Sequence, residues 1–243
     1  MDLMGPSLES LFEMCDKSFS LRTVSILGLQ LLRRLKFIHS KGILHRDIKP
    51  DNIVMGVDGD ENKVYLIDFG LSKRFMVGGK HGKSSCSNDF LLLFVIYFVS
   101  TTDNLTCVDI EQSVRSDLEA LGYVLLYLMT GMLPWYGLSV EKLMKNKEQL
   151  GDDVDTMCKG APAALAEYFA YLFELDFGPK PVYRKLSQYV AQMASKDEKN
   201  EQQHEFEWLV CFNSSFSLIL FLCSTFGAER LRNNPLINIL MKC

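Results

Sequence analysis

Seven cysteines are present, but no two of them form a Cys-x-x-Cys pair, and the sequence has only four histidines. Structural zinc sites usually use paired cysteine and histidine ligands, so we expect no zinc site. An odd number of scattered thiols is typical of a reducing compartment, which predicts a cytoplasmic or nuclear protein. The N-terminus also has no basic region followed by an apolar core, so we expect no secretory signal.

The chain also has no strong excess of charge of either sign. Its formal net charge is −4, which gives no broad positive field, so we exclude nucleic acid as the main partner. With 48% hydrophobic and 23% charged residues, the composition is that of a folded globular protein. A chain of 243 residues forms one large domain or two small ones, and we find no internal repeat or low-complexity linker.

Long uncharged apolar runs are few, and two need an interpretation. The run over 90–99 has ten residues and is too short to span a bilayer. The run over 208–228 has 21 residues without a formal charge, which is long enough to span. Its serines and asparagine reduce the free energy gained by inserting the run into a bilayer. We therefore favour a poorly packed extension of the chain over a membrane anchor, and both interpretations stay open.

The spacing of apolar residues predicts several helices. A short helix is expected over 7–15, and Ser20 is a suitable N-cap for a longer one that runs to His39. Gly42 suits the left-handed position after that helix. Further helices are expected over 140–150, from Pro162 onward, and around 186–193. The longer helix has one core-facing stripe, formed by Val24, Leu27, Leu31, Leu35 and Ile38.

A helix over 116–129 is apolar on every face after its first turn, as expected of a helix in the centre of a core. Ser116 and Glu119 form a capping-box pattern, which predicts that the helix starts at Ser116. Asp117 is then an anomaly, because a lone charge is costly to bury. Either it accepts hydrogen bonds from another segment, or it interacts only with the helix dipole.

The most informative residues form the run His-Arg-Asp-Ile-Lys-Pro-Asp-Asn at 45–52, followed by Asp-Phe-Gly at 68–70. The runs 53–55 and 64–67 favour β-structure, and the polar turn between them contains Asp-Gly. We therefore predict a hairpin between the two motifs. Such a hairpin would bring its entry and exit residues together despite their separation in sequence.

These residue types at this spacing suit phosphoryl transfer, which requires positioning and charge neutralisation more than covalent help. Asp47 can accept or orient the proton of a substrate hydroxyl, and Lys49 can neutralise charge on the transferred phosphate. Asn52 and Asp68 are candidate ligands of one metal ion. We interpret His45 as a packed, hydrogen-bonded residue, since Asp47 already provides the proton acceptor.

Two further residues have supporting roles in this interpretation. Arg46 can fix the loop, or pair with a phosphate on the segment that follows, through bidentate hydrogen bonds. Gly70 would let the backbone turn after Asp-Phe without a Cβ clash. Neither residue is expected to touch the reacting atoms.

With these motifs the chain resembles the serine/threonine protein kinases, and more narrowly the casein kinase 1 family. The resemblance covers about 1–80 and 107–212. The resemblance also implies that the catalytic-loop backbone donates the hydrogen bonds that Asp117 accepts. The stretches that carry the narrower resemblance are 1–8, 45–52, 111–113, 116–123, 133–138, 158–160, 180–183 and 206–210.

The resemblance implies an α+β, mostly α fold: a protein-kinase-like C-terminal lobe with a small catalytic-loop β-hairpin. We expect the N-terminal lobe to be absent, because the sequence has no Gly-x-Gly-x-x-Gly run and Met1 falls where the hinge should begin. The expected domains are a kinase-like lobe over 1–212 and a hydrophobic tail of unknown role over 213–243. Within the lobe, 81–106 differs from the activation segment of the family.

For function, the resemblance implies ATP-dependent phosphoryl transfer to serine and threonine of protein substrates, acidic or phosphate-primed, with Mg²⁺. Met1 and Leu3 would contact the nucleotide with Asn52 and Asp68. Without a covering lobe, however, the phosphates would lack part of their contacts. We therefore expect weak or no activity from this chain, and two other hypotheses stay open: a non-catalytic kinase-like module that binds proteins, and an incomplete gene product.

Overall fold

A computed structural model describes residues 4–57, 59–75, 113–136, 154–175, 181–194 and 206–209. The expected divergent segment over 81–106, the helix over 140–150 and the tail over 213–243 lie outside these residues. In the part that is described, no helix is both long enough and apolar enough to cross a membrane.

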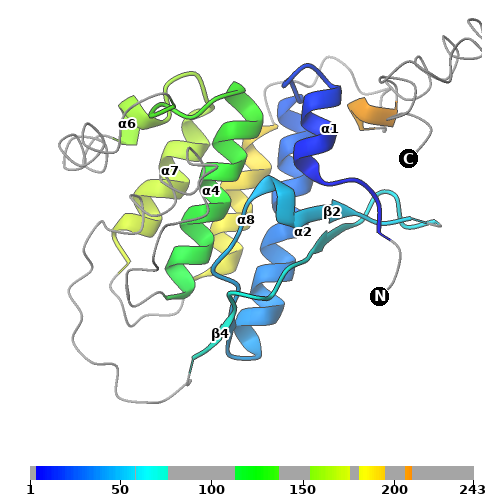
Figure 1. The fold of residues 1–243 in the computed structure, drawn as a ribbon. Coiled ribbons are helices and arrows are strands. Elements are labelled where there is room, and N and C mark those ends of the chain that lie inside the picture. The colour runs from blue at the N-terminus through cyan, green and yellow to red at the C-terminus, as the bar shows by residue number, and fades with distance from the viewer. Residues whose placement is uncertain are drawn as a thin grey trace, which may run out of the picture.

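The described chain is mostly helical, in agreement with the predicted class (Figure 1). Its strands form two small antiparallel sheets, β1 with β4 and β2 with β3. The sequence did not predict the first of these pairs. In chain order the elements are α1 (Leu8–Met14), α2 (Leu21–Ser40), β1 (Ile43–Leu44), the 3-10 turn η1 (Pro50–Asn52), β2 (Ile53–Met55), β3 (Val64–Leu66), β4 (Lys73–Arg74), α4 (Val114–Thr130), α6 (Val154–Met157), α7 (Ala163–Phe173) and α8 (Tyr183–Met193).

The first two helices begin and end within one residue of the predicted positions. The hydroxyl of Ser20 accepts a hydrogen bond from the backbone N–H of Thr23 at 3.2 Å, which satisfies one of the free donors at the start of α2. Ser7 caps α1 in the same way. After α2 the chain reverses at Gly42, whose φ of +70° lies in the left-handed region that favours glycine.

The start of α4 differs from the prediction. The helix begins at Val114, and Ser113 with Ser116 forms the capping box, so the expected box of Ser116 with Glu119 is wrong. Glu119 instead forms an ion pair with Arg115, one turn earlier on the same helix. The sequence pattern was ambiguous because two serines stand three residues apart. The helix ends at Thr130, and its C-cap Gly131 has a φ of +78°.

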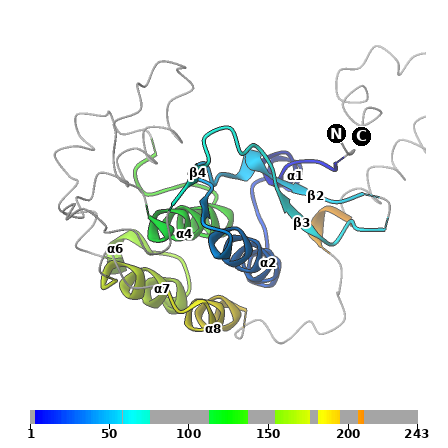
Figure 2. The ribbon, with the colours of Figure 1, turned by 90° about the horizontal axis from the view of Figure 1, so that it is seen from below.

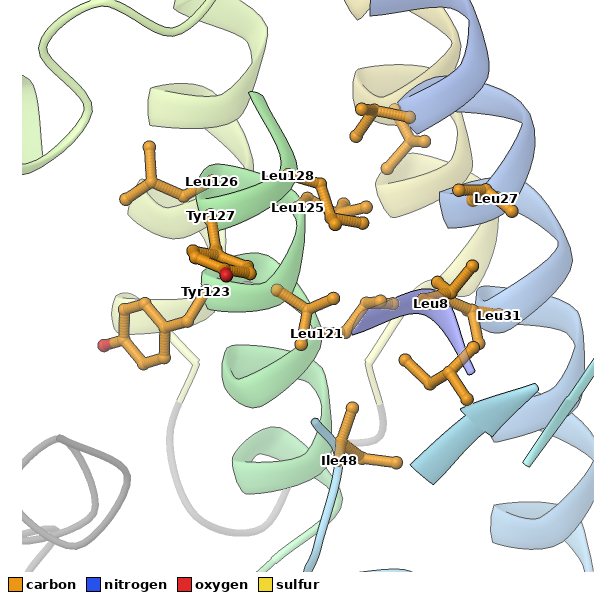
Figure 3. Packing of buried hydrophobic residues seen from close by; sticks show 14 of the residues in the cluster. Leu8, Leu27, Leu31, Ile48, Leu121, Tyr123, Leu125, Leu126, Tyr127 and Leu128 are labelled. Carbon is orange, nitrogen blue, oxygen red and sulfur yellow. The ribbon is translucent and has the colours of Figure 1, made fainter. Parts of the chain in front are cut away.

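The core is built around α4, which is buried along nearly its whole length. Figure 3 shows side chains of α1, α2 and α4 gathered in one cluster, joined by Ile48 from the loop after β1. The helices α7 and α8 pack on the other side of α4 and α2, away from the β2–β3 hairpin (Figure 2). The apolar stripe of α2 is buried as predicted, except that Ile38 is only partly buried.

Gly122 lets α7 approach α4 closely. A Cβ at Gly122 would lie 2.6 Å from Cζ of Phe169 and 3.0 Å from Cε1 of Tyr168. We expect Gly122→Ala to lower the free energy of unfolding by about 1–2 kcal/mol, because overpacking outweighs the gain in helix propensity of roughly 1 kcal/mol. Urea denaturation tests this, with Phe169→Leu expected to be less damaging in the Gly122→Ala background. A more stable Gly122→Ala variant would contradict the close packing.

Candidate active site

The loop between β1 and η1 is held by the buried carboxylate of Asp117. Its Oδ2 accepts a hydrogen bond from the backbone N–H of His45, and its Oδ1 accepts one from that of Arg46, both at 2.8 Å. Asp117 is only 1% exposed, and His39 Nε2 also lies 2.8 Å from its Oδ2. The expected hydrogen bonds to the loop backbone are therefore present, and the helix dipole alone does not account for this burial.

Asp47, Lys49 and Asn52 come together within this loop. Asn52 Nδ2 donates to Asp47 Oδ2 at 2.6 Å and to the Asp47 backbone carbonyl at 3.0 Å. Lys49 Nζ lies 3.3 Å from the same Oδ2. Because a carbonyl can only accept, these bonds fix which amide atom of Asn52 is the nitrogen and leave its Oδ1 as an acceptor.

The predicted hairpin is present, and it brings Ile67, the residue before Asp68, against Asn52. Ile53 pairs with Leu66 in the sheet, and the backbone N–H of Ile67 donates to the carbonyl of Asn52 at 3.0 Å. Asp68 is therefore the first residue past the paired end of the hairpin. It is exposed, and its Oδ1 accepts a hydrogen bond from the backbone N–H of Gly70 at 3.1 Å.

The donor atoms at this end of the hairpin fit a magnesium ion. An amide oxygen and a carboxylate are the hard oxygen ligands that Mg²⁺ prefers, usually together with waters and substrate phosphates. Within the described ranges, no group of three or more His, Cys, Asp and Glu side chains could hold a metal by itself. A Mg²⁺ ion at Asn52 and Asp68 would take further ligands from waters and substrate phosphates.

His45 has the structural role that we expected of it. It is fully buried, its Nε2 donates to the carbonyl of Ile67 at 3.1 Å, and its ring lies 4.7 Å from that of Phe69. Burial lowers the pKa of His45, despite the nearby Asp117 carboxylate. The imidazole is thus held neutral and hydrogen-bonded between the two motifs, which suits a packing residue.

Arg46 and Gly70 shape the approach to the site. Arg46 has a φ of +70°, and its Nε donates to the carbonyl of Leu71 at 2.5 Å, which links the loop to the segment after Asp-Phe-Gly. At that turn the left-handed residue is Asp68, with a φ of +59°, rather than Gly70. A Cβ at Gly70 would lie 3.0 Å from Asp68 Oδ1, so a larger residue there would require this exposed carboxylate to shift.

Sequence reasoning placed no role on His39, which contacts Asp117 from the end of α2. Its burial could have been predicted from its position four residues after Leu35, on the core-facing stripe of that helix. Two predicted nucleotide contacts, Met1 and Leu3, lie outside the described residues.

A comparison with protein families gives one match for this chain. A family model described as "Protein kinase domain" matches residues 1–199. The matched range contains every residue of the candidate site, from the loop at 45–52 through Asp68 to Asp117.

Proposed function

Since this chain belongs to the protein kinase family, we propose that it is a serine/threonine kinase of the casein kinase 1 type. Membership of the family implies the use of ATP, usually with a divalent metal, and protein substrates in general. The narrower assignment, with acidic or phosphate-primed substrates, is supported by the resemblance at 1–8, 116–123 and 206–210. A cytoplasmic or nuclear location is supported by the scattered thiols.

The assembly of Asp47, Lys49 and Asn52 carries this proposal. The contacts from Asn52 and Lys49 both fall on Asp47 Oδ2, so we assign Oδ1 as the oxygen that receives the proton of the substrate hydroxyl. Fixing one carboxylate oxygen orients the other, and orientation is the main contribution that a protein makes to this reaction. Lys49 stands beside the carboxylate, where its charge can stabilise the negative charge of a transferred phosphate.

Asn52 Oδ1 and the Asp68 carboxylate are the atoms that would hold Mg²⁺. The ion would neutralise the phosphates of ATP and fix their orientation. The protein contributes the spacing of these two ligands, because the register of β2 and β3 sets it.

A second candidate is a kinase-like module that binds proteins without catalysis. The observation in its favour is that the 243 residues contain no Gly-x-Gly-x-x-Gly run, the loop that covers the phosphates in protein kinases. Nucleotide sites normally bury most of their ligand. We therefore propose that this polypeptide by itself transfers phosphate well below the ~1–100 s⁻¹ of typical kinases.

Titration of the purified 243-residue chain with ATP, with and without Mg²⁺, tests the proposed site. We expect weak binding that requires Mg²⁺, and we expect Asp68→Asn to bind ATP more weakly than wild type in the presence of Mg²⁺, because one of the two proposed metal ligands is changed. Asp60→Asn is the matched control, since it changes an aspartate at the opposite end of the same hairpin. Folded protein that binds no ATP would favour the protein-binding module, and Asp68→Asn binding like wild type would refute the metal site.

A further inference from the structure

Tyr183 joins the distant helix α8 to the site. It is the first residue of α8, and its hydroxyl is hydrogen-bonded to Nδ1 of His39 near the end of α2. The other ring nitrogen of His39 contacts Asp117, which in turn holds the backbone of His45 and Arg46. Three helices are thus connected to the loop through one chain of side chains.

The contacts also define the direction of these hydrogen bonds. Both oxygens of Asp117 accept from backbone N–H groups, which suits the carboxylate, and a carboxylate can only accept. His39 Nε2 therefore carries the proton that faces Asp117. In the neutral imidazole Nδ1 then has a lone pair, and the Tyr183 hydroxyl is the donor in their bond.

The environment of Tyr183 supports this direction. Burial raises the pKa of its phenol, and the nearby Asp117 carboxylate raises it further, so the hydroxyl keeps its proton at neutral pH. His39 is 6% exposed and Asp117 is 1% exposed, so solvent has little access to either group. A buried imidazole with two directed partners has one tautomer and one ring orientation.

We propose that Tyr183 is a positioning residue: it fixes the tautomer and orientation of His39 and, through His39 and Asp117, the backbone of the loop at His45 and Arg46. The connection follows from the contacts alone. Only the statement that the positioned loop is catalytic rests on the proposed function. A role in filling space, in contrast, would need the ring of Tyr183 but not its hydroxyl.

Native-state amide hydrogen exchange on the full 243-residue chain tests the connection. Tyr183→Phe removes only the hydroxyl, and we expect the amides of His45 and Arg46 to exchange about fivefold to tenfold faster. The amide of Met55, which donates to the carbonyl of Pro6, is expected to be unchanged. Tyr189→Phe is the matched control on the same helix, because Tyr189 lies against Tyr171 and Lys185. Equal exchange in the two variants would overturn the proposal.

A double-mutant cycle tests whether the effect passes through His39. His39→Gln removes the ring nitrogen that accepts from Tyr183, while its amide can still donate towards Asp117. If Tyr183 acts through His39, Tyr183→Phe adds no further exchange at His45 and Arg46 in the His39→Gln background. A full additional effect there would mean that the hydroxyl acts by another route, and would overturn the proposal.

Side-chain ¹⁵N NMR of the wild-type chain supplies a readout that needs no variant. In the proposed arrangement His39 carries one proton, on Nε2, and we expect the ¹⁵N spectrum to show it there. A proton on Nδ1, or on both nitrogens, would overturn the proposal even if Tyr183→Phe destabilises the whole chain. None of these measurements uses a nucleotide, so failure of the proposed kinase function would appear separately, as a lack of ATP binding.

Discussion

Asp47→Asn is expected to lower the residual phosphate transfer of this chain by about 10²–10⁴-fold, the range typical of losing a general base. Its amide can still accept the hydrogen bond from Asn52 Nδ2, so the loop geometry is kept while the proton acceptor is lost. The measurement is a single-turnover assay with labelled ATP, casein and excess enzyme, which detects slow transfer.

The control for Asp47→Asn is Glu167→Gln, an exposed position on α7 where the same carboxylate-to-amide change should leave transfer unaltered. Denaturation midpoints of the two variants show whether the fold is intact. Transfer that is equal in Asp47→Asn and wild type would show that Asp47 is not the base, or that a contaminating kinase is responsible. Transfer by the wild type at a rate typical of kinases would instead refute the weak activity that we propose.

Asp117→Ala is expected to have the largest effect on stability, with a loss of about 3–5 kcal/mol in the free energy of unfolding. The substitution leaves three donors without an acceptor in a buried place: His39 Nε2 and the backbone N–H groups of His45 and Arg46. Each unsatisfied donor costs about 1–3 kcal/mol. Urea denaturation with a fitted slope measures the loss and shows whether the unfolded state has changed.

Two further variants test whether the loss of stability is specific to the Asp117 carboxylate. Asp117→Asn keeps one oxygen as an acceptor and should lose less stability than Asp117→Ala, although its amide N–H₂ then faces a donor. Asp155→Asn, at an exposed position on α6, should change stability by no more than about 0.5 kcal/mol. If Asp117→Ala and Asp155→Asn were equally mild, Asp117 would not be the support of the loop.

Local patterns predicted most of the elements around the site. Ser20 was recognised as a cap, and the Asp-Gly turn between two β-favouring runs predicted the hairpin of β2 and β3. These features depend on residues a few positions apart, so the sequence shows them directly. The start of α4 was misplaced because the choice between two serine caps depends on where neighbouring segments leave the helix end.

What the sequence alone determined is the order and spacing of chemical groups: a proton acceptor, a cation and two oxygen ligands around a predicted hairpin. Only the tertiary structure decided what holds them. The pairing of β1 with β4, and the path from Tyr183 through His39 to Asp117, join residues that are far apart in the chain. Such partners leave no local pattern, because they are brought together by packing of whole helices, in which burial of apolar faces fixes the distances between polar side chains.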